Sequence, residues 1–272
     1  MLESLISRYI FVCTLIIFFG LSSITYAQNQ EDMIPEDTEF YEPVPTVIES
    51  GENIFLDPPT DAIILFDGTD MSKWETTNGD EVTWNIEDGV LTVDIGDGLT
   101  IERIQTKESF GDVQLYLEWR SPMNMDHKGQ DRGNSGVFLQ SLYEVQVLDA
   151  YENPTYINGM AGSIYKQTAP LVNPSNKPGE WESYNISFKA PKFNDDGSLK
   201  SPGQVTVIWN GVVIQNNTKI LGHTPFIGFP EYNAHGEAPL QLQDHNSEVS
   251  FRNIWIRRLD SENQFSIKDH MD

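Results

Sequence analysis

The sequence predicts an all-β protein, an antiparallel β-sandwich of the jelly-roll type. Short runs with apolar residues at every second position recur about every ten residues, and turn signals separate them. We find no convincing long amphipathic helix pattern and no fixed-period repeat. The chain has 272 residues, of which 39% are hydrophobic, and this is enough to bury a sizeable core. A single domain over residues 61–260 is the simplest account of this pattern.

Each predicted strand alternates apolar and polar residues, so one of its faces is expected to be buried and the other polar. Asn210-Gly211, between two of these runs, is the strongest short hairpin signal in the chain. The last run changes its apolar phase near Arg252-Asn253, which predicts a β-bulge there. The apolar residues of successive runs are Val82, Trp84 and Ile86; Leu91, Val93 and Ile95; Val113, Leu115, Leu117 and Trp119; Tyr143, Val145 and Val147; Tyr184, Ile186 and Phe188; Val205, Val207 and Trp209; Val212 and Ile214; and Leu240 and Leu242.

Residues 1–27 are typical of a secretory signal peptide. Arg8 precedes the apolar run YIFVCTLIIFFGL, and Thr25-Tyr26-Ala27 has the small-x-Ala pattern of a cleavage site. The apolar run is short for a membrane span, which needs ~20 residues. We therefore expect an exported chain, periplasmic or secreted, with no membrane span after cleavage.

The only cysteine, Cys13, lies inside this apolar run and follows Val12. A lipoprotein signal needs a small residue before a cysteine at the end of the apolar run, so we expect no lipidation. The mature chain would then contain no cysteine. This excludes disulfides, a thiol nucleophile and a zinc–thiolate site.

Residues 28–60 form an acidic, proline-rich segment before the predicted domain. The segment contains nine Asp or Glu residues, five prolines and no Lys or Arg. Such a composition buries too little apolar surface to offset the entropy of ordering, so we expect a mostly disordered leader. The tail over residues 261–272 is polar, and we expect it to be frayed.

The charge balance excludes some classes of partner. The chain has 17 Lys and Arg residues against 41 Asp and Glu residues, a formal net charge of -24. Such a surface repels phosphate backbones and anionic lipid, so we expect no nucleic-acid partner. The sequence also lacks a phosphate-cradling glycine loop, a Gly-x-Ser-x-Gly elbow and a His-Glu-x-x-His helix. We therefore expect no nucleotide or flavin cofactor.

Polar residues are dense in the segment DRGNSGVFLQ, residues 131–140. Its two glycines permit backbone conformations closed to other residues, and Arg132, Asn134 and Ser135 surround them. One interpretation is a loop that enters a strand, in which Asn and Ser satisfy the backbone of a turn. The other interpretation is part of a binding or catalytic site.

The segment YEVQVLDAY, residues 143–151, places Glu144 and Gln146 on the strand face opposite its apolar residues. Asp149 would join them only if a bulge shifted the phase of the strand by one residue. The spacing is similar to the Glu-x-Asp-x-x-Glu catalytic strand of laminarinase-type β-glucanases, with Gln at the middle position and a shorter final acid. Retaining glycosidases need two carboxyl groups about 5 Å apart. The alternative is a solvated face of an acidic protein.

The segment PLQLQDHNSEVSFRNIWIRRL, residues 239–259, places Gln241, Gln243 and His245 on the face opposite Leu240 and Leu242. A Gln-Asp-His run at the end of a strand could supply a base, a metal ligand or a clamp for a sugar. A lone histidine more often has a structural role.

Aromatic residues offer flat apolar surfaces to the C–H groups of a sugar. Tyr165, in GSIYKQTAP, and Trp181, in PGEW, are candidates for such stacking. Core packing is the more common role of a tryptophan in a sandwich.

Five segments of the chain together resemble the 3-keto-disaccharide hydrolase domain family, in the order of that family. The resemblance covers residues 61–260, and Asn246 stands where the last block of the family often has Gly, at a turn that Asn tolerates. It implies a concanavalin A-like jelly roll, usually exported by bacteria, that acts on glycosides whose C3 hydroxyl is already oxidised to a ketone. The segments are LFDGTDMSKWE (65–75), RGNSGVFLQSLYEVQVLDAY (132–151), GSIYKQTAP (162–170), PGEWESYNISFKAPKF (178–193) and APLQLQDHNSEVSFRNIWIRRL (238–259).

The implied chemistry needs a base, an electropositive group and an acid. A C3 ketone acidifies the C2 proton, so a base can remove it to form an enolate, after which the C1 aglycone leaves and water adds to the enone. We expect Glu144 or His245 to be the base. Arg132 or a bound divalent ion would stabilise the enolate, with Lys166 as an alternative electrophile. Asp149 or His245 would assist departure of the aglycone.

The remaining polar candidates would hold the substrate, an oxidised glycoside. Glu144, Asp149 and His245 also offer hard oxygen and imidazole ligands, so a divalent metal ion is compatible with the sequence and its presence stays open. The substrate-binding candidates are Asn134, Ser135, Gln146, Tyr165, Lys166, Gln243 and Asp244.

Two other classes of function stay open at this point. A laminarinase-like retaining glycosidase would cleave unoxidised β-glucan, and Gln146 argues against it. A lectin-like domain would bind carbohydrate without turnover, since this fold serves both purposes.

Overall fold

The structure is a computed structural model in which the chain divides into two compact units. The described part of the first unit comprises residues 32–38 and 225–229, and the second unit runs from Glu39 to Thr224 and from Pro230 onward. No helix in the described part of the chain is long and apolar enough to cross a membrane. The predicted signal peptide and the polar tail lie outside the described residues. The described residues are 32–51, 55–96, 103–123 and 126–259.

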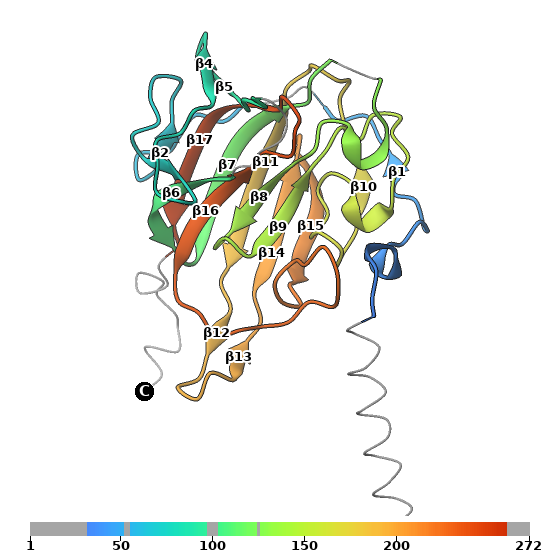
Figure 1. Ribbon diagram of the computed structural model, residues 1–272, viewed down its shortest axis with the longest axis vertical. Helices are drawn as coiled ribbons and strands as arrows, with labels where there is room; N and C mark the ends of the chain where they lie inside the picture. Colours follow the sequence, from blue (N-terminus) through green and yellow to red (C-terminus); the bar gives the residue numbers. More distant parts are fainter. Residues whose placement is uncertain (1–31, 52–54, 97–102, 124–125, 260–272) are drawn as a thin grey trace, which may run out of the picture. The chain divides into compact units, whose positions relative to one another are not determined.

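The second unit is a sandwich of two antiparallel sheets, with the smaller sheet in front of the larger one in Figure 1. The fold class predicted from the alternating runs is confirmed. The smaller sheet has the order β3 (Trp74–Thr76), β6 (Arg103–Phe110), β16 (Ala238–Gln243), β8 (Ser135–Leu139) and β9 (Tyr143–Val147). The larger sheet has the order β15 (Val212–Lys219), β14 (Gln204–Trp209), β11 (Glu182–Lys189), β7 (Val113–Arg120), β17 (Ser250–Arg258), β5 (Val90–Thr92) and β4 (Asn85–Glu87), and β2 (Ile63–Phe66) also pairs with β17.

Short elements complete the described chain. They are the two-stranded pairs β1 (Thr46–Val47) with β10 (Val172–Asn173) and β12 (Lys192–Phe193) with β13 (Leu199–Ser201), and the 3-10 turns η1 (Pro35–Thr38), η2 (Gly129–Asp131) and η3 (Ile157–Gly159).

The core lies between the two sheets and takes its side chains from the predicted alternation. In β9, Tyr143, Val145 and Val147 are buried in this core, so Glu144 and Gln146 point from the opposite face of the smaller sheet. Leu240 and Leu242 of β16 are also in the core. Gln241, which lies between these two leucines, therefore shares the outer face of the smaller sheet with Glu144 and Gln146.

Two local predictions, a hairpin and a bulge in the last strand, are confirmed. Asn210 and Gly211 both have positive φ, at 50° and 80°, and join β14 to β15 in a hairpin. The pairing of β17 with β7 shifts register after Arg252, as the change of phase predicts. The pairing of β9 with β8 has no shift in register up to Val147, where β9 ends. Beyond it, Val147 and Leu148 are both in the core, and the Asp149 N–H donates to Arg132 O at 3.1 Å.

Part of the acidic leader is bound to the sandwich, whereas composition predicted mostly disorder. We call residues 39–51 the N-terminal strap. Its strand β1 pairs in parallel with β10, and the backbone N–H of Ile48 donates to Asn173 O at 3.0 Å. Leu56, farther along, donates its N–H to the Tyr116 hydroxyl at 3.1 Å. These bonds join backbone groups to distant parts of the chain, and composition carries no information about such partners.

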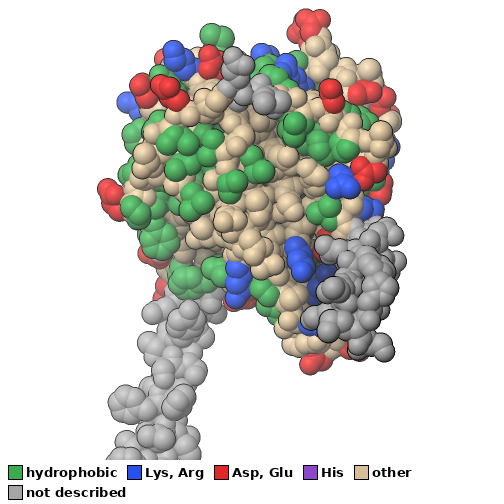
Figure 2. Space-filling model, turned by 180° about the vertical axis from the view of Figure 1, so that it is seen from behind, with side chains coloured by type: hydrophobic (Ala, Val, Ile, Leu, Met, Phe, Trp, Pro, Cys, Tyr) green, Lys and Arg blue, Asp and Glu red, His purple; other side chains and the backbone are tan. Residues whose placement is uncertain are grey.

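A hollow of about 960 Å³ lies over β11, β14 and β17 of the larger sheet. Ser187, Lys189, Thr206 and Arg257 line it, and none of the candidate site residues does. Figure 2 shows the side of the molecule opposite to that in Figure 1, with uncharged side chains over most of its centre. This hollow is therefore separate from the polar row of the smaller sheet.

Candidate active site

The outer face of the smaller sheet carries a row of amide and charged side chains from four strands. Gln241 of β16 donates to Gln105 of β6 at 3.2 Å, and Gln105 donates to Glu75 of β3 at 3.1 Å. Arg103 of β6 lies with its guanidinium carbon 3.9 Å from the centre of the Phe138 ring. Phe138 pairs in register with Glu144, so the row continues to β9 at the edge of the sheet.

Glu144 is buried on this face without a partner for its carboxyl group. Its side chain is 5% exposed, and within the described residues the carboxyl oxygens have no hydrogen bond and no ion pair. Burial raises its pKa to about 8, and the positive charge of Arg103 acts in the opposite direction. A buried carboxyl of this kind holds its proton near neutral pH and is a strong base once it loses it.

Gly136 of β8 provides the room for the Glu144 carboxyl. A Cβ at this position would stand 2.3 Å from Glu144 Oε1 and 2.8 Å from a ring carbon of Phe138. Both contacts are too close for any side chain. The lack of a side chain at Gly136 therefore allows the Glu144 carboxyl to lie close to β8.

Two tyrosines lie beside Glu144. The segment after β9 turns back along it, and Tyr165 donates its backbone N–H to Glu144 O at 3.1 Å. The hydroxyls of Tyr165 and Tyr156 are 2.9 Å apart. Burial, chiefly, raises the pKa of Tyr165 to about 12 and that of Tyr156 further, and the charge of Glu144 adds to both shifts. Both hydroxyls therefore stay protonated at neutral pH and are available as donors.

Lys166 brings a buried ammonium group to the same cluster. Its Nζ lies 5.5 Å from the ring centre of Tyr156 and 6.0 Å from that of Tyr165. Glu39 of the N-terminal strap approaches it, with 3.5 Å between Lys166 Nζ and Glu39 Oε1. The candidate cluster thus contains one acid from β9, two phenols, one ammonium group and a second acid from the leader.

Gln146 and Asn134, both predicted to hold hydroxyl groups, are in contact. Gln146 Nε2 donates to Asn134 Oδ1 at 3.1 Å, and Asn134 Nδ2 donates to Gln130 O at 2.8 Å. Gln146 Oε1 is buried without a hydrogen-bond partner. This oxygen is therefore a free acceptor next to Glu144 on the same strand face.

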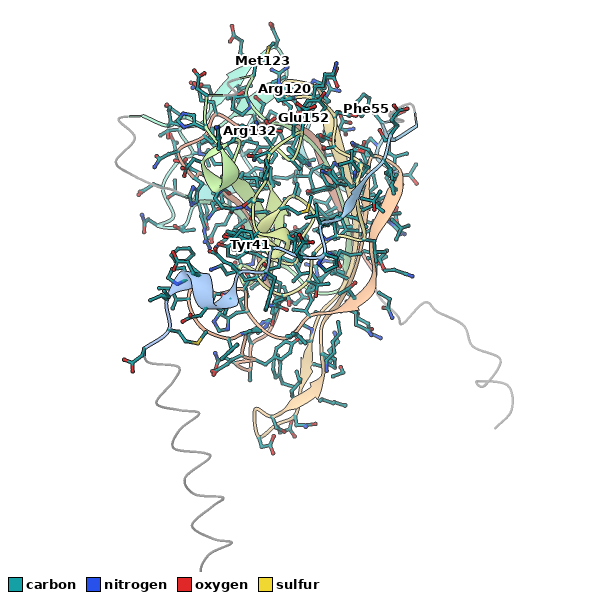
Figure 3. The ribbon with its side chains drawn as sticks, turned by 90° about the vertical axis from the view of Figure 1, so that its right-hand side faces the viewer. Tyr41, Phe55, Arg120, Met123, Arg132 and Glu152 are labelled. Atoms are coloured by element: carbon teal, nitrogen blue, oxygen red, sulfur yellow. The ribbon has the colours of Figure 1, made fainter. Side chains whose placement is uncertain are left out.

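Arg132 and Asp149 are paired with each other rather than with the cluster. Arg132 Nε lies 2.9 Å from Asp149 Oδ2, and Arg132 Nη2 also donates to Tyr151 O. The other carboxyl oxygen of Asp149 accepts from the N–H of Tyr151 at 2.9 Å. Figure 3 shows Arg132 well apart from Tyr41, which contacts Tyr156 of the cluster. The structure therefore gives this buried pair a structural role where the segments around β8 and β9 meet.

The remaining predicted residues lie in or around the turn after β16. Ser135 is fully buried and donates to Gln243 O at 2.6 Å, so its hydroxyl ties β8 to β16. Asp244 is buried and accepts the N–H of Asn246 at 2.8 Å, and Asn246 has a φ of 55°. His245 is exposed between them, and its imidazole has no hydrogen bond or ring contact with the described residues.

The three metal-ligand candidates are not assembled. Within the residues that the structure describes, no three His, Cys, Asp or Glu side chains are grouped as metal ligands. Asp149 is bound to Arg132 and Tyr151, and His245 is exposed in its turn. The donor set expected from sequence therefore does not form a metal site with Glu144.

Sequence reasoning missed several residues of the outer polar row and of the candidate cluster. Arg103 and Gln105 alternate with buried Ile104, so the period of two in their strand was a usable signal. Tyr156 and Glu39 have no such signal, because they lie in irregular segments and reach the site through long-range contacts.

Comparison with known proteins relates this arrangement to carbohydrate-processing proteins. A curated protein of Bacteroides thetaiotaomicron named "3-keto-disaccharide hydrolase" is 26% identical over 267 residues, covering 78% of this chain and 84% of that protein. A crystal structure from Parabacteroides distasonis, provisionally called a glycosyl hydrolase, is 51% identical with a TM-score of 0.72 and covers 82% of this chain and 96% of that one. A second structure from the same organism has 23% identity and a TM-score of 0.52, covers 74% of this chain and 94% of that one, and supports the fold alone.

The match to a family agrees with the resemblance found in the five sequence segments. Residues 61–257 match the family described as "3-keto-alpha-glucoside-1,2-lyase-like domain". The match contains β2 through most of β17, and so both sheets of the sandwich. It leaves out the N-terminal strap and Glu39. The chain therefore belongs to the family of 3-keto-α-glucoside-1,2-lyase-like domains.

Proposed function

We propose that this protein cleaves the glycosidic bond of 3-keto-glycosides by removing the C2 proton, eliminating the aglycone and adding water. The observation that carries the proposal is Glu144, a buried carboxyl that has no partner among the described residues and a pKa raised to about 8. The predicted signal peptide adds the expectation that the protein acts after export. The name of the relative from Bacteroides thetaiotaomicron supports an oxidised disaccharide as the substrate class.

Glu144 is the base in this proposal. Its carboxylate takes the proton from C2, and the electron pair moves to the C3 oxygen to form the enolate. The electrons return as the C1–O bond breaks, which leaves a double bond between C1 and C2. Water then adds its hydroxyl at C1 and a proton at C2, so the sum is hydrolysis. A base acts best when its pKa is near the working pH, and a carboxyl of ordinary pKa would be too weak.

The positive groups around Glu144 are suited to the enolate. The positive charge of Arg103, on β6, acts directly on Glu144, and Lys166 lies by Tyr165 and Tyr156 in the segment after β9. A cation aimed at a developing oxyanion in a buried site stabilises the transition state strongly. Arg132 is less suited than sequence analysis expected, because its guanidinium is occupied by Asp149 and Tyr151.

The tyrosine pair is suited to the leaving group. Tyr165 and Tyr156 keep their protons, since the pKa of each is raised, and their hydroxyls exchange a hydrogen bond at 2.9 Å. A proton passed to the leaving oxygen by one hydroxyl can be replaced from the other. In this proposal one of the two tyrosines is the acid that protonates the leaving group, a role that sequence analysis expected of Asp149 or His245.

The geometry does not favour a retaining glycosidase. That mechanism needs two carboxyl groups about 5 Å apart. Val147, at the end of β9, is already three residues from Glu144, a distance of about 10 Å at ~3.3 Å per residue. Asp149 lies beyond it with both carboxyl oxygens engaged.

Parallel incubation with two aryl glucosides tests the proposal. One substrate carries a ketone at C3 and the other is unoxidised, and released phenol is measured. We expect release from the oxidised substrate alone. Phenol from the unoxidised glucoside would support a glycosidase instead, and binding of both without release would support a lectin.

Variants of the full chain test the site. Glu144→Gln keeps the shape of the side chain and removes the base, so we expect kcat to fall about 10²- to 10⁴-fold. His245→Ala is the matched test of the alternative base, and Glu248→Gln removes an exposed acid as a control. Full activity of Glu144→Gln, or loss of activity in His245→Ala alone, would move the base to the turn after β16.

A further inference from the structure

Two consecutive aromatic residues of the N-terminal strap are exposed beside the candidate site. Phe40 is 57% exposed and Tyr41 is 60% exposed. The preceding residue, Glu39, contacts Lys166 of the cluster. Large exposed aromatic side chains next to a polar site are typical of binding surfaces rather than of core packing.

The backbone under these rings is held in place on both sides. Phe40 N–H donates to Asn158 Oδ1 at 3.1 Å, and Phe40 O accepts from the N–H of Ile157 at 2.6 Å. Farther along, β1 pairs with β10. The strap therefore presents its aromatic rings from a fixed backbone, so little entropy is lost when a ligand contacts them.

Tyr41 is the last of three neighbouring aromatic rings that lead away from Glu144. Its ring centre lies 6.5 Å from that of Tyr156 with the planes at 74°, and the Tyr156 ring lies 6.4 Å from that of Tyr165. The Tyr41 hydroxyl donates to Glu39 Oε2 at 3.0 Å, which fixes the orientation of the exposed ring. Tyr165 is next to the acid, Tyr156 follows, and Tyr41 is outermost.

We propose that Tyr41 is an outer sugar subsite, which stacks on the second pyranose ring of the substrate while the oxidised ring lies at Glu144. The proposal rests on the proposed function, because Glu144 defines which ring is the inner one. A pyranose presents apolar C–H groups on one face, and these pack against an aromatic ring. Glu39 positions the subsite, since it binds both the Tyr41 hydroxyl and Lys166. The strap lies outside residues 61–257, which match the family.

Calorimetry with unoxidised sugars tests the subsite without relying on turnover. The probes are an α-1,2-linked diglucoside and methyl α-glucoside, each titrated into the full chain. We expect the wild-type chain to bind the diglucoside more tightly, and Tyr41→Ala to weaken diglucoside binding about 3- to 10-fold. Binding of methyl α-glucoside should not change. Tyr41→Phe keeps the ring and should retain at least half of the diglucoside affinity.

Phe55→Ala is the matched control, because it removes an exposed aromatic side chain near the C-terminal end of the acidic leader, residues 28–60. Phe55 is 42% exposed, packs on Arg252 and lies well apart from Tyr41 in Figure 3. We expect it to bind both sugars as the wild type does. Two outcomes overturn the subsite: a wild-type chain that binds the diglucoside no more tightly than methyl α-glucoside, or an equal loss in Phe55→Ala and Tyr41→Ala.

The same variants give a kinetic readout with 3-keto substrates. With the 3-keto diglucoside, Tyr41→Ala should raise KM and leave kcat within about twofold, since stacking on the outer ring does not touch the reacting atoms. With methyl 3-keto-α-glucoside, both constants should stay unchanged. Absence of turnover in the wild type would count against the proposed function, whereas the calorimetry would still decide the subsite.

Discussion

Glu182 and Glu144 are buried in two different ways, and the difference indicates which of the two is reactive. Glu182 of β11 is 5% exposed, like Glu144. Its carboxyl accepts from Trp209 Nε1 at 2.8 Å, from the N–H of Asn176 at 2.8 Å and from Asn210 Nδ2. Burial raises its pKa to about 7, and these bonds act in the opposite direction. Glu144 has no such bonds to its carboxyl, and its pKa is raised to about 8.

Two equally buried carboxyl groups, those of Glu182 and Glu144, therefore have different roles. Around Glu182, three donors from two segments converge on one carboxyl: Trp209 and Asn210 at the end of β14, and the backbone of Asn176. The acid therefore organises this end of the larger sheet. Around Glu144, the neighbours include a glycine, two phenols and the guanidinium of Arg103, and no described residue bonds to the carboxyl. A buried polar group left without a partner costs stability, and that cost is typical of a functional site.

Loss of the Glu182 carboxyl should have the largest effect on folding. Glu182→Ala leaves the Trp209 and Asn210 donors buried without an acceptor, so we expect the free energy of unfolding to fall by about 3 kcal/mol. Glu144→Gln should leave it unchanged or raise it, since no bond is lost. Denaturant unfolding of both variants at one pH measures the contrast. Equal destabilisation by the two substitutions would contradict the distinction.

The pH dependence of activity and of stability should run in opposite directions. If Glu144 must be ionised to act as base, kcat/KM should rise with pH and level off above about 8, the pKa of the folded state. The pKa of Glu144 in the folded state is raised above its ordinary value of 4.5. The contribution of Glu144 to the free energy of unfolding is therefore complete below pH 4.5 and is lost as pH rises through about 8.

The stability difference between Glu144→Gln and the wild type should therefore widen with pH. The widening is expected between roughly pH 5 and 8, at no more than about 1.4 kcal/mol per pH unit. Denaturant unfolding at several pH values checks it, alongside a pH–rate profile. A rate profile that is flat between pH 6 and 9 would assign the base to another group.

Filling the space beside Glu144 should have a smaller effect that is confined to the site. In Gly136→Ala the new methyl group would meet Glu144 Oε1 and the Phe138 ring, so the carboxyl must move. We expect kcat to fall about 10-fold, with a loss of stability of about 1 to 3 kcal/mol from overpacking. Gly236→Ala is the control, since a methyl group there meets nothing within 4 Å. Unchanged turnover in Gly136→Ala would show that the position of the acid is not critical.

The local part of the candidate site could be predicted from residue order. Alternation in β9 places Glu144 and Gln146 together on the outer face, and the segment before β8 supplies Asn134 beside Gln146. The partner of Asp149 could not be predicted in this way. Asp149 lies after the end of β9, where the alternation of the strand no longer sets its direction, and it forms an ion pair with Arg132.

The sequence by itself determined the class of the fold, the faces of the strands, the turn at Asn210-Gly211 and the bulge near Arg252-Asn253, because these depend on neighbours along the chain. Only the tertiary structure decided that no described residue bonds to the Glu144 carboxyl, that Tyr156 lies against Tyr165 and Lys166, and that the acidic leader joins the site through Glu39. From its composition alone, the leader was expected to be a solvated and mostly disordered chain. The physical reason is that burial and long-range contacts depend on the path of the whole chain, and residue periodicity reports only one element at a time.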